Sequence, residues 1–169
     1  MVIQIDSRER KNEHITAYFD AHKIKYVVSK MYVGDYQRID NGLVCIDKKF
    51  GLDEVYNCVV KDYIRFSDEC KRAKAAGVRL VMLIEDDTIA SLAHVREWDN
   101  PRRKRWEKIN AEHANGKKLK TKIPAMPPVS SDRIEKRMAT LSKRYGVEWQ
   151  FCRKEDTARR ILEILGYED

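Results

Sequence analysis

Two aspartates and a lysine lie around a predicted hairpin turn in the first third of the chain. Asp35 precedes the turn, and Asp47 and Lys49 follow it. If residues 40–42 (Asp-Asn-Gly) form a three-residue turn with Gly42 in the left-handed conformation, Asp35 lies directly opposite Asp47, and Lys49 projects from the same face of the sheet. A two-residue turn would shift the register by one and send Asp35 to the other face. A site that uses both aspartates therefore requires the three-residue turn.

Two carboxylates that face each other across a sheet repel unless a positive charge lies between them. A hard divalent cation, Mg²⁺ or Mn²⁺, suits that place because it takes carboxylate oxygens and keeps several waters. Such an ion polarises a phosphodiester and activates a bound water, and Lys49 would orient that water or offset charge on the phosphorus. The pattern predicts metal-dependent hydrolysis of a phosphodiester. The competing interpretation is a plain surface hairpin with solvated charges.

Other polar residues stand at positions that suit a site, each with an alternative role. Asp6 ends the first predicted strand, at the sheet edge where ligands collect in α/β folds, and Arg8 follows it. Asp53 begins a predicted helix, where a carboxylate serves either a site or the helix dipole. Arg65, on the next helix, either reaches a phosphate or is solvated. Glu85 ends an apolar strand and either supports the site or caps a helix.

The charge of the chain is positive and unevenly distributed. Its 34 Lys and Arg against 27 Asp and Glu give a net charge of +7, which favours a nucleic acid or another anionic surface as partner. Residues 96–122 hold ten basic and four acidic residues, within a predicted insertion over residues 89–128. Trp98 and Trp106 accompany them, and basic residues with aromatic rings grip single strands and DNA branches. The alternative is a solvated basic helix whose tryptophans pack on the domain. The residues of the insertion predicted to bind DNA are Arg102, Arg103, Lys104, Arg105, Lys108, Lys117, Lys118 and Lys120.

Several classes of protein and site are disfavoured. The chain has no apolar run that could span a membrane and no secretory leader, so we expect a cytoplasmic protein. Its four cysteines lack C-x-x-C spacing, which favours reduced, buried thiols over disulfides or zinc ligands. Its four histidines form no H-x-x-H pair. Carboxylates must therefore hold any metal.

Hydrophobic periodicity predicts one α/β domain over residues 1–169. Strands are expected near residues 2–5, 25–31, 36–39, 43–49, 78–84 and 147–152; helices near 12–22, 52–76, 88–115 with a break at 100–101, 134–141 and 158–165. Residues 115–131 hold Gly116, three prolines and several lysines, and are typical of a loop. The order predicts a mixed sheet in which an antiparallel hairpin is followed by parallel strands returned by helices.

The chain resembles the XPF-type structure-selective nucleases, including archaeal Hef, within the PD-(D/E)xK group. Residues 5–9 (IDSRE) resemble the family's D-x-R-E, residues 33–36 (VGDY) its G-D-Y, and residues 45–53 (CIDKKFGLD) its V-E-R-K-x-x-x-D. Arg65-Phe66, the strand ending at Glu85 and the final helix-strand-helix also match in order. The resemblance covers residues 1–87 and 129–166. Asp47 stands where the family has Glu, and Lys48 where it has Arg, which removes a planar fork of donors.

This resemblance implies a restriction-endonuclease-like mixed sheet flanked by helices, carrying a basic helical insertion. It implies a Mg²⁺- or Mn²⁺-dependent endonuclease that cuts branched DNA, such as flaps, forks or Holliday-like junctions, in repair or recombination. The implied metal ligands are Asp35, Asp47 and Asp6; Lys49 is the implied catalytic lysine, Arg8 and Asp53 complete the site, and Lys48 and Arg65 contact DNA. Family members pair through this domain, so a homodimer through residues 130–166 is expected.

The family's helicase and tandem helix-hairpin-helix modules have no counterpart in these residues, and the basic insertion would stand in for the second. That suggests a free-standing, phage- or prophage-like product acting in a bacterial host cell. Two alternatives remain: a catalytically inactive DNA-binding scaffold with the same fold, and a protein-interaction factor that uses the insertion.

Overall fold

The computed structural model describes residues 1–118 and 124–167 of the chain, so the predicted DNA contact Lys120 lies outside the described residues. The elements of the first half are β1 (Ile3–Asp6), α1 (Glu13–Ala21), β2 (Tyr26–Ser29), β3 (Tyr36–Arg38), β4 (Val44–Phe50), α2 (Gly51–Tyr56), the π-helix η1 (Asn57–Lys61) and α3 (Tyr63–Ala75). Those of the second half are β5 (Arg79–Glu85), the 3₁₀-helix η2 (Leu92–Glu97), α4 (Pro101–Ala114), α5 (Ser131–Tyr145), β6 (Glu148–Cys152), the 3₁₀-helix η3 (Lys154–Asp156) and α6 (Thr157–Ile164).

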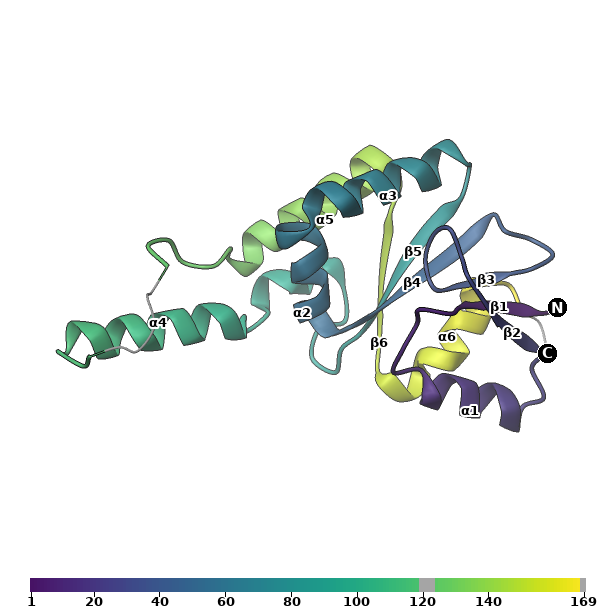
Figure 1. The fold of residues 1–169 in the computed structure, drawn as a ribbon, viewed down its shortest axis with the longest axis horizontal. Helices are drawn as coiled ribbons and strands as arrows, with labels where there is room; N and C mark the ends of the chain where they lie inside the picture. Colours follow the sequence, from purple (N-terminus) through teal and green to yellow (C-terminus); the bar gives the residue numbers. More distant parts are fainter. Residues whose placement is uncertain (119–123, 168–169) are drawn as a thin grey trace.

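A six-stranded mixed sheet runs through the centre of the domain in the order β2-β1-β3-β4-β5-β6 (Figure 1). The pairs β1–β3 and β3–β4 are antiparallel, whereas β1–β2, β4–β5 and β5–β6 are parallel. The predicted mixed α/β fold is therefore confirmed. Its connections follow the usual rule that a hairpin joins antiparallel strands and a helix returns parallel ones.

The two faces of the sheet carry separate cores. On one face, α2, η1, α3, η2 and α5 pack against alternate residues of β4 and β5, among them Cys45 and Met82. On the other, α1 and α6 cover Ile46, Val81 and Leu83. Because successive strand residues point to opposite faces, Asp47 and Lys49 share the face of Cys45, whereas Lys48 shares the face of Ile46.

The hairpin pairs Tyr36 with Ile46 and Gln37 with Cys45, which is the predicted register. The turn itself differs from the prediction. Gly42 does not have a positive φ, and the N–H of Leu43 donates instead to the side-chain oxygen of Asn41 at 3.3 Å. The connection between β3 and β4 is longer than the predicted three-residue turn, and a hydrogen bond to a side chain replaces a backbone hydrogen bond within it. The register is thus preserved without a left-handed Gly42.

The long helix predicted after β4 is divided into α2, η1 and α3. Five residues of π-helix, Asn57–Lys61, separate the two α-helical segments. Arg137 of α5 donates to the carbonyl oxygen of Val59 at 2.9 Å and so satisfies one of the displaced backbone acceptors. A single-turn π-helix changes the direction of a helix and is frequent near functional sites. Hydrophobic spacing alone did not reveal it.

Glu85 links the end of β5 to two helices, and its contacts are with neither Asp35, Asp47 nor Lys49. Its carboxylate accepts a hydrogen bond from the hydroxyl of Thr157 (2.8 Å) at the start of α6 and lies 2.7 Å from Nε2 of His14 on α1. These contacts join the end of β5 to the two helices that cover one face. None of the described helices is long and apolar enough to cross a membrane.

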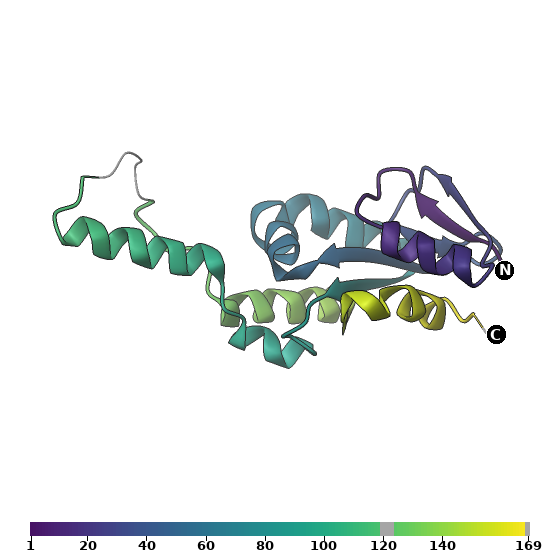
Figure 2. The same cartoon turned by 90° about the horizontal axis from the view of Figure 1, so that it is seen from below.

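Within the predicted insertion, α4 stands away from the rest of the domain (Figure 2), whereas η2 packs against the core. Helix α4 projects beyond η2 and α5, and none of its described residues is buried. Pro101 occupies its first turn, and the side chain of Asn100 accepts the N–H of Arg102 at 3.1 Å. The predicted break at residues 100–101 is therefore the start of this helix, because proline suits the first helical turn.

Candidate active site

The chain bends at Asp35, just before β3 begins its regular pairing with β4. The N–H of Asp35 donates at 2.7 Å to the carbonyl oxygen of Ile46, the residue that pairs with Tyr36. Two consecutive residues thus face one, which is the arrangement of a β-bulge. The bulge directs the carboxylate of Asp35 against β4, where it accepts the N–H of Lys48 at 2.8 Å.

Gly34 makes this close approach possible. Its φ is +63°, and a Cβ atom at this position would lie 2.5 Å from Sγ of Cys45 and 2.8 Å from the carbonyl oxygen of Ile46. Both the backbone conformation and the space therefore require glycine. The Gly-Asp pair of the sequence is the local device that presents Asp35 to the neighbouring strand.

Asp35, Asp47 and Lys49 come together as predicted. Burial raises the pKa of Asp35 well above its usual range, and the negative charge of Asp47 together with a hydrogen bond between the two carboxyl groups adds to this. The ammonium group of Lys49 forms an ion pair with Asp47. Burial disfavours the charged form of Lys49, yet the charges of Asp47 and Asp35 outweigh it and raise the pKa of this lysine. Lys49 is therefore a cation and not a general base.

The charge of Glu9 acts on this group, although sequence reasoning did not select it as a site residue. Burial raises the pKa of its carboxyl group, and Lys48, Lys49 and Asp47 all act on its charge. Its Oε1 lies 3.2 Å from Nζ of Lys48 but forms no hydrogen bond among the described residues. The signal was present in the D-x-R-E match, where Glu9 is the second acid of the motif.

Asp6 does not meet the others through its carboxylate. Oδ1 accepts the backbone N–H of Arg8 (2.7 Å) and its Nε (2.9 Å), while Oδ2 accepts the second guanidinium nitrogen (2.8 Å) and the N–H of Met31 (2.9 Å). The hydrogen bonds from Arg8 lower the pKa of Asp6 to about 2. A carboxylate whose acceptor positions are filled in this way has none left for a metal, which is at odds with the prediction of Asp6 as a ligand. Its contacts instead fix Arg8 and the loop that leads to Asp35.

Lys48 is also placed differently from its prediction. Its side chain is 3% exposed and faces Glu9 from the sheet surface that α1 and α6 cover. Because this side chain points into the protein, it cannot reach DNA in this conformation. The alternation along β4 places Lys49 and Lys48 on opposite faces, so only one of them can serve the site with Asp47.

A family model of the ERCC4 domain matches residues 5–164 of the chain. The chain belongs to the ERCC4 domain family. This is a family of structure-specific DNA nucleases, and the match confirms the resemblance found in the motifs. A search of curated proteins found no match.

Two solved structures share the fold of this ERCC4 domain. XPF from Aeropyrum pernix is 11% identical with a TM-score of 0.62, and XPF from Aeropyrum pernix in complex with DNA is 12% identical with a TM-score of 0.57. Each match covers 98% of this chain and 63% of the other, so the chain spans less than two thirds of their length. At such identity the likeness concerns the fold.

Asp53 of this ERCC4 domain contacts the insertion. Its half-exposed carboxylate forms an ion pair with Arg102 of α4. The same guanidinium donates to the side chain of Asn57 at 3.2 Å and lies 4.5 Å from the centre of the Tyr56 ring. Asp53 thus belongs to a contact between α2 and α4, and it is not among the residues that act on Asp35, Lys49 or Glu9.

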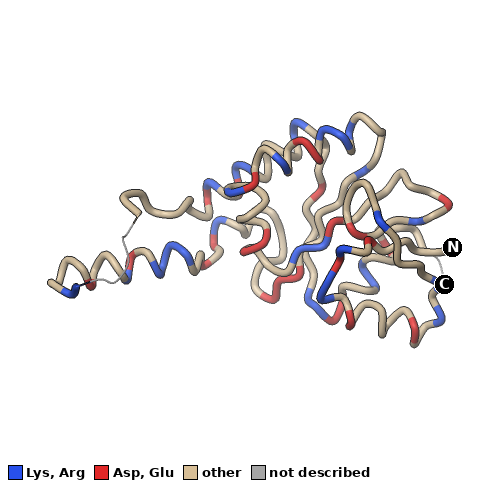
Figure 3. Tube along the Cα trace, in the orientation of Figure 1, with Lys and Arg blue, Asp and Glu red and all other residues tan. Residues whose placement is uncertain are grey.

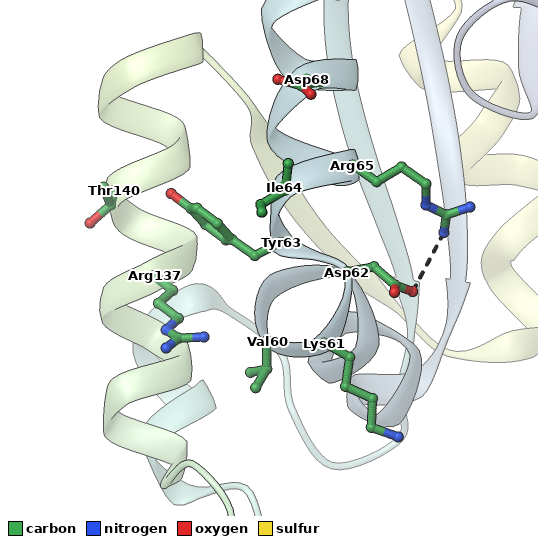
Figure 4. A pocket seen from close by; sticks show the side chains of 9 residues that line it. All are labelled: Val60, Lys61, Asp62, Tyr63, Ile64, Arg65, Asp68, Arg137 and Thr140. Atoms are coloured by element: carbon green, nitrogen blue, oxygen red, sulfur yellow. Dashed lines mark ion pairs between the residues drawn. The ribbon is translucent and has the colours of Figure 1, made fainter.

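Arg65 is exposed beside the site. Its side chain is 82% exposed, and its ion pair with Asp62 is long at 3.6 Å. It borders a groove of about 880 Å³ between α3 and α5. Its side chain points away from Arg137, which lies on α5 at the same groove (Figure 4). Burial raises the pKa of Cys58 to about 11, and the positive charges of Lys49 and Arg65 both oppose this shift. Arg65 is therefore an available cation near the candidate site.

The basic residues of the insertion lie along α4 (Figure 3). Arg103 pairs with Glu107 and Lys104 with Asp99, whereas Arg105 and Lys108 form no ion pair within the described part of the chain. Farther on, Lys117 pairs with Glu112, and Lys118 is exposed.

The two tryptophans are placed differently. Trp98 packs against the core, and Trp106, on α4, donates to the carbonyl oxygen of Pro124 at 2.9 Å.

Two carboxyl groups and a lysine form the centre of the site, and a half-buried glutamate, Glu9, lies nearby. Within residues 1–118 and 124–167, no three Asp, Glu, His or Cys side chains converge closely enough to form a complete set of metal ligands. Mg²⁺ commonly takes only one or two carboxylates and completes its coordination with waters and substrate phosphate. A pair of hard oxygen donors beside an acid lacking a hydrogen bond at one oxygen fits that mode of binding.

Proposed function

We propose that this chain is a divalent-metal-dependent endonuclease that hydrolyses phosphodiester bonds in branched DNA. The observation that carries the proposal is the pair of adjoining carboxyl groups, Asp35 and Asp47, beside the ammonium group of Lys49. A carboxyl group with a raised pKa next to a second acid is costly to the folded protein, and such perturbed groups cluster at functional sites. Membership of the ERCC4 domain family supports the same reaction.

Asp35 and Asp47 are the residues that would hold Mg²⁺ or Mn²⁺, with Glu9 next to them. When bound, the ion would polarise the phosphodiester and lower the pKa of a water. Lys49 remains protonated through the working pH range, so its charge stabilises the negative charge that develops on the attacked phosphate. Arg8, held by Asp6 and 66% exposed, is positioned to bind a neighbouring phosphate.

Branched DNA is proposed as the substrate because cations lie on separate elements around the site. Arg8 follows β1, Arg65 lies on α3, and Arg105 and Lys108 lie on the projecting helix α4. A helix that stands off the domain can contact a duplex arm that the site itself does not reach. The similar fold of an XPF that was solved in complex with DNA supports this use of the fold.

A homodimer through residues 130–166 stays a prediction. Helices α5 and α6 lie along one side of the molecule (Figure 2). The large apolar side chains that are exposed within the described residues lie elsewhere, for example Val28 on β2 and Ile64 on α3, whereas homodimer interfaces are usually apolar at their centre. Light scattering across protein concentrations tests this prediction directly.

The proposed activity is tested with a panel of labelled DNAs (duplex, flap, fork and four-way junction) incubated with and without Mg²⁺ or Mn²⁺. Wild-type protein is expected to cut at least one branched substrate in the presence of the ion only. Asp47→Asn and Lys49→Gln should each lower the rate by about 10²-fold or more, because the first removes a charge that would hold the ion and the second a cation that would stabilise the attacked phosphate.

Lys143→Ala, which removes an exposed cation of α5, is the matched control and should cut as wild type does. If no DNA is cut under either ion but binding is retained, the chain is an inactive DNA-binding scaffold. If DNA is not bound at all, a protein-interaction role replaces both.

A further inference from the structure

Tyr32 is the most exposed of the large apolar side chains that the structure describes, at 80%. It lies in the loop between β2 and β3, three residues before Asp35. The guanidinium group of Arg72 on α3 lies 5.6 Å from the centre of its ring. One face of this aromatic ring is thus backed by a cation, and most of the side chain is open to solvent.

The backbone on both sides of Tyr32 is held firmly. The N–H of Met31 donates to Asp6 at 2.9 Å, and its carbonyl oxygen accepts from Arg8 at 3.1 Å. On the other side, the N–H of Gly34 donates to Glu69 at 3.3 Å. The neighbouring side chains of Met31 and Val33 are buried in the core, so the ring is mounted on an anchored loop.

The surroundings of the ring indicate the kind of ligand. Arg8 donates to the carbonyl oxygen of Met31, the residue before Tyr32, and the guanidinium group of Arg72 lies over the Tyr32 ring. Cations therefore flank the aromatic surface. An aromatic face beside arginines matches a nucleotide, whose base stacks on the ring and whose phosphate pairs with a guanidinium group. An apolar protein segment would gain nothing from the two cations.

We propose that Tyr32 and Arg72 form a stacking platform for an unpaired nucleobase next to the phosphodiester that is cut. The base must be unpaired, because a base inside a duplex is stacked on both sides and offers no free face to the ring. This inference rests on the proposed function and deepens it. It explains how the site would favour branched DNA, since branches supply unpaired nucleotides beside a duplex.

The experiment uses a fork in which 2-aminopurine replaces the first unpaired base at the branch, bound to protein carrying Asp47→Asn so that cutting does not interfere. Stacking of this base on an aromatic ring quenches its fluorescence. The test variants are Tyr32→Leu, Tyr32→Phe and Arg72→Gln. Tyr18→Leu is the matched control, because Tyr18 stacks on His22 of α1, on the opposite face of the sheet.

Quenching is expected with Tyr32 and Tyr32→Phe, and its loss with Tyr32→Leu. The fork should bind about 5- to 100-fold more weakly to Tyr32→Leu, the range for the loss of one base–aromatic contact. Arg72→Gln should weaken binding by a smaller factor, and Tyr18→Leu should have no effect. Binding of a fully paired duplex should not change with Tyr32→Leu.

Equal quenching with Tyr32 and Tyr32→Leu, or an equal loss of affinity for fork and duplex, overturns the platform. Cutting of the same forks is measured in parallel with proteins that retain Asp47. If wild type cuts forks and Tyr32→Leu cuts and binds them equally well, the platform fails while the proposed function stands. If nothing is cut but quenching depends on Tyr32, the proposed function fails, and Tyr32 and Arg72 form a platform that binds an unpaired base without cutting beside it.

Discussion

The ammonium group of Lys49 forms an ion pair with the carboxylate of Asp47, two residues before it on strand β4. Both side chains project from the same face of the strand, and both are largely buried. The carboxyl group of Asp35, the residue before β3, adjoins this pair. The lysine is thus the cation that compensates these acids in the metal-free protein.

Replacing Lys49 by Met should destabilise the metal-free protein by roughly 1–3 kcal/mol, because it leaves a buried carboxylate without its partner. Mg²⁺ should then raise the melting temperature more in Lys49→Met than in wild type, since the ion supplies the missing positive charge. Thermal unfolding in EDTA and in Mg²⁺ measures both effects. The double variant Asp47→Asn/Lys49→Met is the control and should recover stability in EDTA without the larger response to Mg²⁺. An equal response of all three proteins contradicts the assignment of Asp47 as a ligand.

The raised pKa of Asp35 predicts a dependence of stability on pH. In the folded protein this carboxyl group keeps its proton at pH values where the unfolded chain has already lost it. The free energy of unfolding should therefore fall as the pH rises above the ordinary value of 3.8 and through the raised value. Urea unfolding of the metal-free protein from about pH 5 to about pH 8 measures this slope. Asp35→Asn should have a smaller slope, and an unchanged slope would show that Asp35 titrates normally.

Binding of Mg²⁺ should release protons, because a metal ligand must be deprotonated. Calorimetric titration in buffers of different ionisation enthalpy counts those protons. Wild type should release protons at neutral pH and Asp35→Asn should release fewer.

Gly34→Ala should lower stability by roughly 2–4 kcal/mol. The left-handed backbone disfavours any side chain by about 1–2 kcal/mol, and the overlap with Cys45 and the Ile46 carbonyl adds a similar amount. Gly77→Ala is the matched control, since its φ is +68° but an added Cβ would meet nothing within 4 Å. Gly77→Ala should lower stability only by the cost of placing a side chain on a left-handed backbone. Equal losses in the two variants, measured by denaturant unfolding, would show that the close approach at Gly34 does not matter.

Arg102 should hold the first turn of α4 against α2. Arg102→Ala should increase amide hydrogen exchange in residues 101–106, and Arg102→Lys should restore little, because an ammonium group cannot replace a planar guanidinium that bonds Asp53 and Asn57 and covers Tyr56. Arg103→Ala is the control. Arg103 pairs only with Glu107 on its own helix among the described residues, so exchange there should change much less.

The unpaired cations of α4 should determine part of the salt dependence of DNA binding. Replacing Arg105 and Lys108 by Ala should reduce the slope of log K against log salt by about 0.9 for each phosphate contact that is lost. The slope is measured from binding titrations between low and moderate salt. Lys104→Ala/Lys143→Ala removes the same net charge, but Lys104 is already paired with Asp99 and Lys143 lies on α5, so this control should change the slope less. Equal slopes for the two double variants would remove α4 from the DNA interface.

Local patterns of the sequence were enough to predict the strands, most of the α-helices and the register of the hairpin. Apolar alternation distinguishes strands from helices because the two have different periods, and it gave the mixed sheet with its antiparallel start. The motif residues around Gly34, Asp35 and Asp47 are close in the chain or joined by one hairpin, so strand pairing together with the local bulge at Gly34 brings them together.

Only the tertiary structure decided which acids share the site. Asp6 is taken up by Arg8 and Met31, Asp53 by Arg102, and Glu9 by Lys48, although the charge of Glu9 also acts on Asp35. Such contacts join residues far apart in the chain, and their partners depend on how the elements pack, which periodicity does not encode. The sequence by itself therefore determined the fold and the central Asp-Asp-Lys group. Packing decided the role of each surrounding charge, because a buried charge takes whichever partner the fold brings within hydrogen-bond reach.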